Sequence, residues 1–142
     1  MTHEVEANWT GQMKFKIESP GGILTVDAAE EFGGSDSGLR SKPLMLSSLA
    51  GCTGMDIASL LEKMRVTVDK VNIHVSAELT EEHPKIYKKT HIVYTFTGQH
   101  LDEAKLEKAV NLSFDRYCGV IAMFKSFSEV TFEVVYLTMN HS

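Results

Sequence analysis

The sequence predicts an α+β fold with an antiparallel sheet. Three observations lead to this class. Apolar and polar residues alternate with a period of two near both ends of the chain, which is typical of half-buried strands. Residues 43–64 form one long apolar helix, and two shorter helical segments precede the last strand. Because 142 residues suit one hydrophobic core, we expect a single domain spanning residues 1–142.

The first elements are short strands followed by a loop. Residues 5–26 have a strand pattern, since Met13, Phe15 and Ile17 alternate with charged residues. A Ser-Pro-Gly-Gly turn inside this segment separates a final short strand. Residues 27–38 are acidic and rich in glycine, so we expect a flexible loop that acts as a connection or a lid.

The long helix begins at Pro43, a residue that suits the first helical turn. It extends to about residue 64 and is apolar on most sides through its first half. Helices of this type are usually buried all round. In a chain of this size, we expect a curved sheet or a second subunit to cover it.

The remaining elements follow from the same periodicities. Residues 71–76 and 91–96 alternate cleanly and should form an antiparallel hairpin. Residues 101–114 read as an amphipathic helix, residues 119–127 as a second short helix, and residues 130–137 as a closing strand.

Composition excludes several classes of function. The net charge of −5 and the scattered lysines argue against nucleic-acid binding, which needs clustered basic residues. We expect no signal peptide, because the first residues lack a basic and an apolar region. Charged residues interrupt the longest apolar stretch, so we expect no membrane span. The sequence therefore predicts a soluble cytoplasmic protein.

Two cysteines, 66 residues apart, are the main candidates for chemistry. Such a pair can be a redox couple, half of a metal site, or two inert core residues. Cys52 lies in the middle of the long helix, four residues before Asp56, a carboxylate that would raise its pKa by repulsion. An active Cys52 therefore needs a cation, and the candidates are Arg40, Lys42 and Arg116.

Cys118 has a different setting at the start of the second short helix, beside Arg116. A thiol at a helix N-terminus has a lowered pKa, so local physics favours Cys118 as the thiolate. The sequence leaves the distance between the thiols open. It predicts no metal site, because there is no Cys-x-x-Cys pair and no histidine near either cysteine.

The two cysteine segments, residues 41–57 and 117–124, together resemble those of the OsmC/Ohr family. The resemblance implies an intertwined α+β homodimer in which an antiparallel sheet wraps around a long central helix. It implies reduction of organic or lipid hydroperoxides without a metal or cofactor. In that scheme Cys52 becomes a sulfenic acid, Cys118 condenses with it to a disulfide, and an external dithiol reduces the pair.

The chain departs from the peroxidases of that family in two places. Pro43 stands near the position of a helix-start glutamate, and Arg40 comes later than the family's loop arginine. We expect Arg40 to activate Cys52, with Asp56 anchoring Arg40 or Arg116 as possible support. The alternatives are a dimer of the same fold that binds a small ligand or senses redox state without efficient peroxidase activity, and a structural dimer with inert thiols.

Overall fold

The computed structural model describes residues 1–139; the last three residues of the predicted domain lie outside this part. The chain divides into two compact units, which we call the N-terminal unit (residues 1–45) and the C-terminal unit (residues 46–142). The α+β class is confirmed: each unit contains a three-stranded sheet, and one long helix supplies the centre of the larger core.

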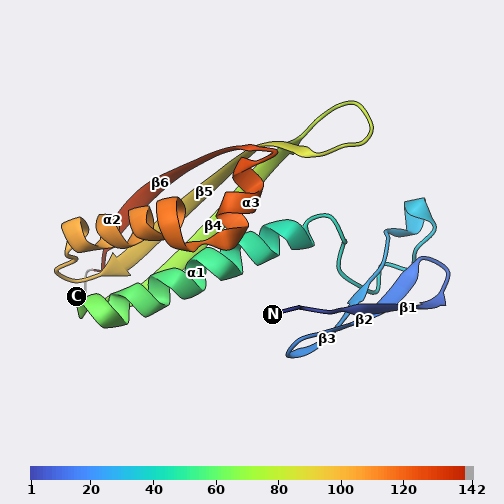
Figure 1. Cartoon of the computed structure of the whole chain (residues 1–142), viewed down its shortest axis with the longest axis horizontal. Coiled ribbons are helices and arrows are strands. Elements are labelled where there is room, and N and C mark those ends of the chain that lie inside the picture. Colours follow the sequence, from blue (N-terminus) through green and yellow to red (C-terminus); the bar gives the residue numbers. More distant parts are fainter. Residues whose placement is uncertain (140–142) are drawn as a thin grey trace. The chain divides into compact units, whose positions relative to one another are not determined.

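The N-terminal unit is an antiparallel sheet with strand order β1-β2-β3 (Figure 1). Its strands are β1 (Glu6–Gly11), β2 (Lys14–Ser19) and β3 (Gly22–Val26). The sequence pattern predicts one strand before the Ser-Pro-Gly-Gly turn, and this prediction is wrong, because two strands lie there. A tight turn divides them, because Gly11 and Gln12 both adopt positive φ, 114° and 51°.

The segment expected as a flexible loop has defined structure. It contains a short 3₁₀ helix, η1 (Glu30–Phe32), and returns to β3, where Leu39 exchanges backbone hydrogen bonds with Thr25 and Asp27. Two glycines permit this close return. A Cβ on Gly34 would lie 2.0 Å from the Ala28 carbonyl oxygen, and Gly38 is similarly close to β3.

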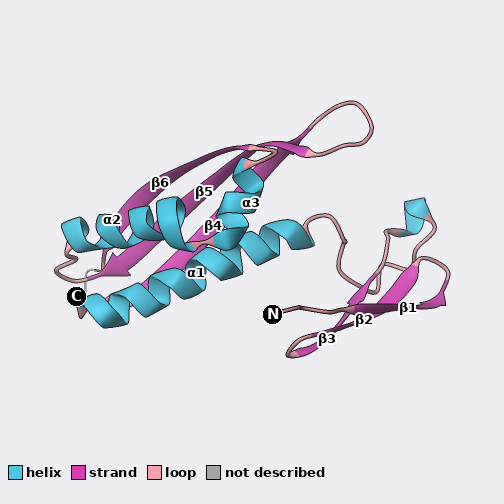
Figure 2. Ribbon diagram, viewed as in Figure 1, coloured by secondary structure: helices cyan, strands magenta, loops and turns pink. Residues whose placement is uncertain are grey.

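The C-terminal unit contains the long helix, a sheet with strand order β4-β5-β6 and two further helices (Figure 2). The elements are α1 (Leu44–Met64), β4 (Lys70–Leu79), β5 (Tyr87–Gly98), α2 (Glu103–Leu112), a π-helical turn η2 (Ser113–Tyr117), α3 (Gly119–Lys125) and β6 (Glu129–Thr138). The helices and the hairpin agree with the sequence prediction to within a few residues.

The direction of the last strand corrects the expectation of an antiparallel sheet. Strands β4 and β5 are antiparallel, as predicted, but β6 runs parallel to β5. The reason is the connection: α2, η2 and α3 carry the chain back to the end of the sheet where β5 begins. Such a helical crossover is what parallel neighbours require.

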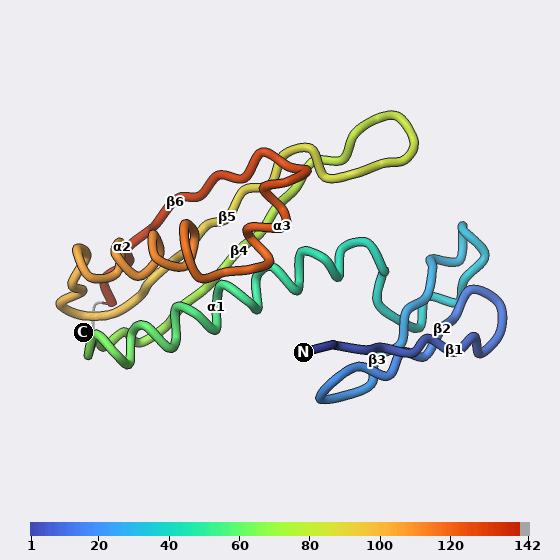
Figure 3. Tube along the Cα trace, in the orientation of Figure 1, coloured from blue at the N-terminus to red at the C-terminus, as the bar shows by residue number. Residues whose placement is uncertain are grey.

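The core of the C-terminal unit lies between this sheet and the helices. Figure 3 shows α1, α2 and α3 beside the strands. Residues spaced four apart form the buried stripe of α1, and alternate residues of β5 meet them. The fully buried side chains include Leu49, Thr53 and Ile57 of α1, Ile92, Tyr94 and Phe96 of β5, Leu106 and Val110 of α2, and Ile121 of α3.

The opposite side of α1 is exposed in the single chain, where Met55 is 76% exposed and Gly51 faces open space. Burial on all sides is therefore not achieved within one chain. Among the described residues, α1 is the one helix long and apolar enough to cross a membrane by length and composition. The core helix of a soluble domain has the same properties, and α1 contributes the central stripe of this core.

Candidate active site

Two elements of the C-terminal unit hold the two thiols. Cys52 is half-buried on the third turn of α1, and Cys118 is 4% exposed at the junction of η2 and α3. Cys118 caps α3: its Sγ accepts a hydrogen bond from the Ile121 N–H at 3.4 Å. Its own N–H donates to the Ser113 carbonyl at 3.0 Å, which closes the π-helical turn. Such turns are frequent at functional sites.

The structure brings the two cysteines together. Both are free thiols, and their side chains are within hydrogen-bonding contact. The sequence did not provide this distance, because the contact joins residues 66 positions apart. A half-exposed thiol therefore lies against a fully covered one, inside a single compact unit.

The setting of Cys118 reverses the expectation that it is the easier thiolate. The pKa of Cys118 is raised to about 11, chiefly by burial and to a smaller extent by contact with the Cys52 thiol. The N–H groups at the start of α3 lower this pKa only in part. Desolvation of the Cys118 thiol, which depends on tertiary packing, raises its pKa by more than the start of the seven-residue helix α3 lowers it.

A chain of buried hydroxyl groups lies beside the thiols. The Thr53 hydroxyl is 2.7 Å from the Tyr94 hydroxyl and 2.8 Å from the Ser113 hydroxyl. Ser113 in turn donates to the Asp56 carboxylate at 2.9 Å. The sequence reading missed Thr53, Tyr94 and Ser113, since hydroxyl residues on three separate elements form no local motif.

The two supporting residues are not paired as expected. Among the described residues, no ion pair joins Asp56 to an arginine, and its side-chain partner is Ser113. Arg116 is exposed, with its guanidinium carbon 6.0 Å from the centre of the Tyr117 ring. Within the described residues of one chain, Asp56 therefore does not pair with Arg116.

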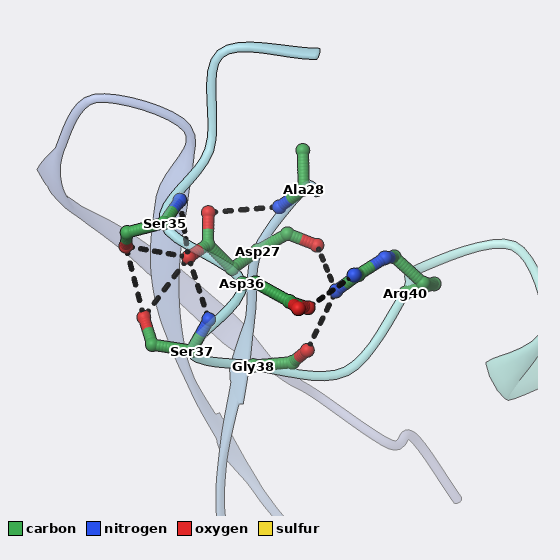
Figure 4. Close-up of polar contacts among 7 residues, drawn as sticks. All are labelled: Asp27, Ala28, Ser35, Asp36, Ser37, Gly38 and Arg40. Atoms are coloured by element: carbon green, nitrogen blue, oxygen red, sulfur yellow. Dashed lines mark hydrogen bonds and ion pairs between the residues drawn. The ribbon is translucent and has the colours of Figure 1, made fainter. Parts of the chain in front are cut away.

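Arg40 belongs to the N-terminal unit and is held there by its own loop (Figure 4). Its guanidinium forms an ion pair with Asp36 and donates to the carbonyl oxygens of Gly38, at 3.0 Å, and Asp27, at 3.4 Å. Arg40 also borders an open groove of about 610 Å³ in this unit, together with Phe15 and Phe32. The groove is thus lined by apolar side chains together with one cation, Arg40, and two carboxylates, Asp27 and Glu31.

The loop that carries Arg40 is organised by Asp27, a residue that the sequence reading missed. The Asp27 carboxylate accepts hydrogen bonds from the N–H groups of Ala28, Ser35 and Ser37 and from both serine hydroxyls (Figure 4). These bonds hold the pKa of Asp27 well below its ordinary value. The serines flanking Asp36 were the available signal, because serine hydroxyls often close such loops.

Within residues 1–139, no group of three His, Cys, Asp or Glu side chains is arranged to hold a metal ion. The arrangement that can perform chemistry is a pair of adjacent thiols, one accessible and one buried. It can pass between a dithiol and a disulfide.

The fold and the pair of adjacent thiols together define the class of protein to which this chain belongs. The sequence model of the OsmC-like proteins matches residues 34–133, more than two thirds of the chain. The chain therefore belongs to the OsmC-like family, which confirms the resemblance of its two cysteine segments.

Individual relatives cover nearly the whole chain. Protein YhfA of Escherichia coli strain K12 is 27% identical over 134 residues, which span 93% of this chain and 98% of YhfA. The crystal structure of a hypothetical protein from Aquifex aeolicus VF5 matches with a TM-score of 0.80 at 32% identity, over 96% of this chain and 98% of that one. An organic hydroperoxide resistance protein OsmC from Legionella pneumophila shares the fold, with a TM-score of 0.71 at 16% identity over 95% and 97% of the two chains.

Proposed function

We propose that this protein is a thiol peroxidase that reduces organic hydroperoxides. The observation that carries the proposal is the contact between a half-exposed thiol, Cys52, and a buried thiol, Cys118. A peroxidase of this kind needs one accessible sulfur to meet the peroxide and a second within reach to form the disulfide. The organic hydroperoxide resistance protein of Legionella pneumophila shares the fold and supports the choice of substrate class.

The exposure of the two thiols assigns their roles. Cys52 is the sulfur that attacks, because an alkyl hydroperoxide can reach it, whereas Cys118 is covered and holds its proton strongly. The Cys52 thiolate attacks the terminal peroxide oxygen, the O–O bond breaks, and an alcohol leaves after taking a proton. Cys52 is thereby oxidised to a sulfenic acid.

The second step consumes the sulfenic acid. Cys118 attacks the Cys52 sulfur, an S–S bond forms, and the sulfenic oxygen leaves as water with the proton that Cys118 gives up. An external dithiol then reduces the disulfide by exchange and becomes a disulfide itself. The reaction needs no metal or prosthetic group, and a cytoplasmic location would supply the dithiol.

Arg40 is the cation that we assign to the Cys52 thiolate. Its guanidinium is held by Asp36 and two carbonyl groups, so it is ordered before any substrate arrives. Arg40→Met should slow the attack of Cys52 on cumene hydroperoxide, and Arg116→Met is the matched control on an exposed arginine. Equal rates in wild type and Arg40→Met would remove Arg40 from the mechanism.

The working form is a homodimer. In the single chain the N-terminal unit exposes large apolar side chains, with Trp9 65% and Phe32 71% exposed, and α1 exposes Met55. These exposed side chains support an interaction surface in each unit, because extensive exposed apolar surface usually marks one. Light scattering after size-exclusion chromatography should give a molar mass twice that of one chain. A stable monomer at micromolar concentration would contradict the dimer.

Counting free thiols tests the proposed reaction. Reduced protein is mixed with cumene hydroperoxide, and the thiols of wild type, Cys52→Ser and Cys118→Ser are followed over time. We expect rapid loss of both thiols in wild type, a trapped sulfenic acid in Cys118→Ser and no reaction in Cys52→Ser. If only Cys118 reacts, the two roles are exchanged.

A second candidate is a dimer of the same fold that binds a small ligand or senses redox state without efficient peroxidase activity. Pro43, which stands where the resemblance places a helix-start glutamate, favours this reading. The thiol count separates the two candidates, because this reading predicts that neither cysteine reacts faster with cumene hydroperoxide than a free thiol does.

A further inference from the structure

The hydroxyl groups of Thr53, Tyr94 and Ser113 form a chain with one direction. Each hydroxyl carries a single hydrogen. Ser113 donates its hydrogen to Asp56, so it must accept from Thr53. Thr53 must then accept from Tyr94. The three hydroxyl residues are 0% exposed, and the chain ends on a half-buried carboxylate, so every member is satisfied.

The row of hydrogen-bonded hydroxyl groups connects the elements that carry the two thiols. Thr53 follows Cys52 directly on α1, and Asp56 lies on the next turn of the same helix. Ser113 begins η2, and its carbonyl accepts the N–H of Cys118 at 3.0 Å. The Thr53–Ser113 hydrogen bond therefore joins the neighbour of one cysteine to the residue that holds the backbone of the other.

Tyr94 fixes this junction to the sheet. It lies in the centre of β5, with its ring packed edge-on against Phe132 of β6. Burial raises the pKa of the Tyr94 hydroxyl to about 12, so it stays a hydrogen-bond donor at every working pH. Hydrogen bonds from Tyr94 of β5 to Thr53 of α1, and from Thr53 to Ser113 of η2, thus hold α1 and η2 in position against the sheet.

We propose that Thr53 and Ser113 are positioning residues that hold the two thiols together and set how readily they form a disulfide. The inference rests on the proposed function, because it assigns these residues to its second step. Neither hydroxyl exchanges atoms with the substrate. Their contribution is the effective concentration of one thiol at the other, which depends on how firmly α1 and η2 are joined.

The matched control is a second buried hydroxyl pair in the same unit. The hydroxyl groups of Thr90 of β5 and Ser128, just before β6, lie 2.7 Å apart, and the two residues are buried at 1% and 9% exposure. Thr90 is four residues from Tyr94 along the strand and contacts neither cysteine segment through this bond. Thr90→Val therefore removes one buried hydroxyl–hydroxyl hydrogen bond, of the same kind as the Thr53–Ser113 bond, outside the junction of α1 and η2.

The first experiment measures the dithiol–disulfide equilibrium in glutathione buffers, without peroxide. Two protein thiols are oxidised to a disulfide while glutathione disulfide is reduced to two glutathione molecules, so the electrons balance. We expect Thr53→Val and Ser113→Ala to lower the equilibrium constant for disulfide formation about tenfold, since each substitution removes the hydrogen bond that joins α1 to η2. Thr90→Val should stay within about twofold of wild type.

A further variant distinguishes positioning from simple loss of fold. Thr53→Ser retains the hydroxyl and should restore the wild-type equilibrium. The inference is overturned if Thr53→Val and Ser113→Ala match wild type, or if Thr90→Val shifts the equilibrium as much as they do. If Thr53→Val fails to fold, then a Thr53→Ser variant with a tenfold weaker disulfide would overturn it equally.

A second experiment separates this inference from the peroxidase proposal. With cumene hydroperoxide, Ser113→Ala should form the Cys52 sulfenic acid at the wild-type rate but convert it to disulfide about tenfold more slowly, so that dimedone traps more of it. If wild type does not react with the peroxide, the proposed function fails, yet the glutathione equilibrium still decides the role of the hydroxyl groups.

Discussion

Raising the pH should accelerate closure of the disulfide, because Cys118 attacks only as a thiolate. Its pKa of about 11 leaves about one molecule in ten thousand ionised at pH 7, against about one in a hundred for a thiol at the ordinary value of 9.0. Each unit of pH should therefore increase the rate about tenfold until the pKa is approached. The largest cause of the shift is burial, which remains when Cys52 is modified.

The assay uses Ellman's reagent in place of a peroxide. No sulfenic acid is then formed, so the pH dependence of the rate comes from the Cys118 thiol and not from ionisation of a sulfenic acid. Cys52 reacts first and releases one coloured thiolate, and Cys118 then displaces the second from the mixed disulfide. We expect a slow second phase, independent of reagent concentration, whose rate rises about a thousandfold from pH 6 to pH 9. Cys118→Ser should lack this phase. A second phase that is flat above pH 7 would refute the reasoning, since it would mean that Cys118 is already ionised in the folded protein.

Three further predictions concern stability and are checked by thermal or urea unfolding. Ile57→Ala should lower the free energy of unfolding by about 2–5 kcal/mol because the site is fully buried, whereas Met123→Ala on the exposed side of α3 should change it by less than about 0.5 kcal/mol. Gly34→Ala should cost about 1–3 kcal/mol or more, since its Cβ would strike a backbone carbonyl at 2.0 Å, while Gly22→Ala meets nothing within 4 Å and serves as control. Asp27→Asn should lower the melting temperature at pH 7. The lowered pKa of Asp27 stabilises the fold above its ordinary value of 3.8 and loses this effect as the pH falls, so the gap between variant and wild type should narrow below pH 4, and a constant gap would contradict it.

Much of the fold could be predicted from the sequence because the signals are local. Apolar and polar residues alternate along β4 and β5, and apolar residues recur with the helical period along α1. These patterns predict directly which face of each element is buried. The direction of β6 could not be predicted in this way. Strand direction depends on which end of the sheet the α2–α3 connection reaches, and this is a property of the whole unit.

The candidate site shows the same division between local and tertiary information. The motifs around Cys52 and Cys118 identified the residues, and the family match confirms the resemblance that they suggested. The pKa of Cys118 was predicted with the wrong sign because its burial comes from packing between distant elements. The hydroxyl chain from Tyr94 to Asp56 was invisible for the same reason, since its members lie on α1, β5 and η2.

The most direct test of the account is a single turnover of reduced wild-type protein with one equivalent of cumene hydroperoxide, followed by intact mass and product analysis. The account predicts one cumyl alcohol per chain and a protein that has lost two hydrogen atoms, with the new bond between Cys52 and Cys118. The same experiment on Cys118→Ser should add one oxygen atom at Cys52. Unchanged mass in both proteins after complete mixing would contradict the central claim.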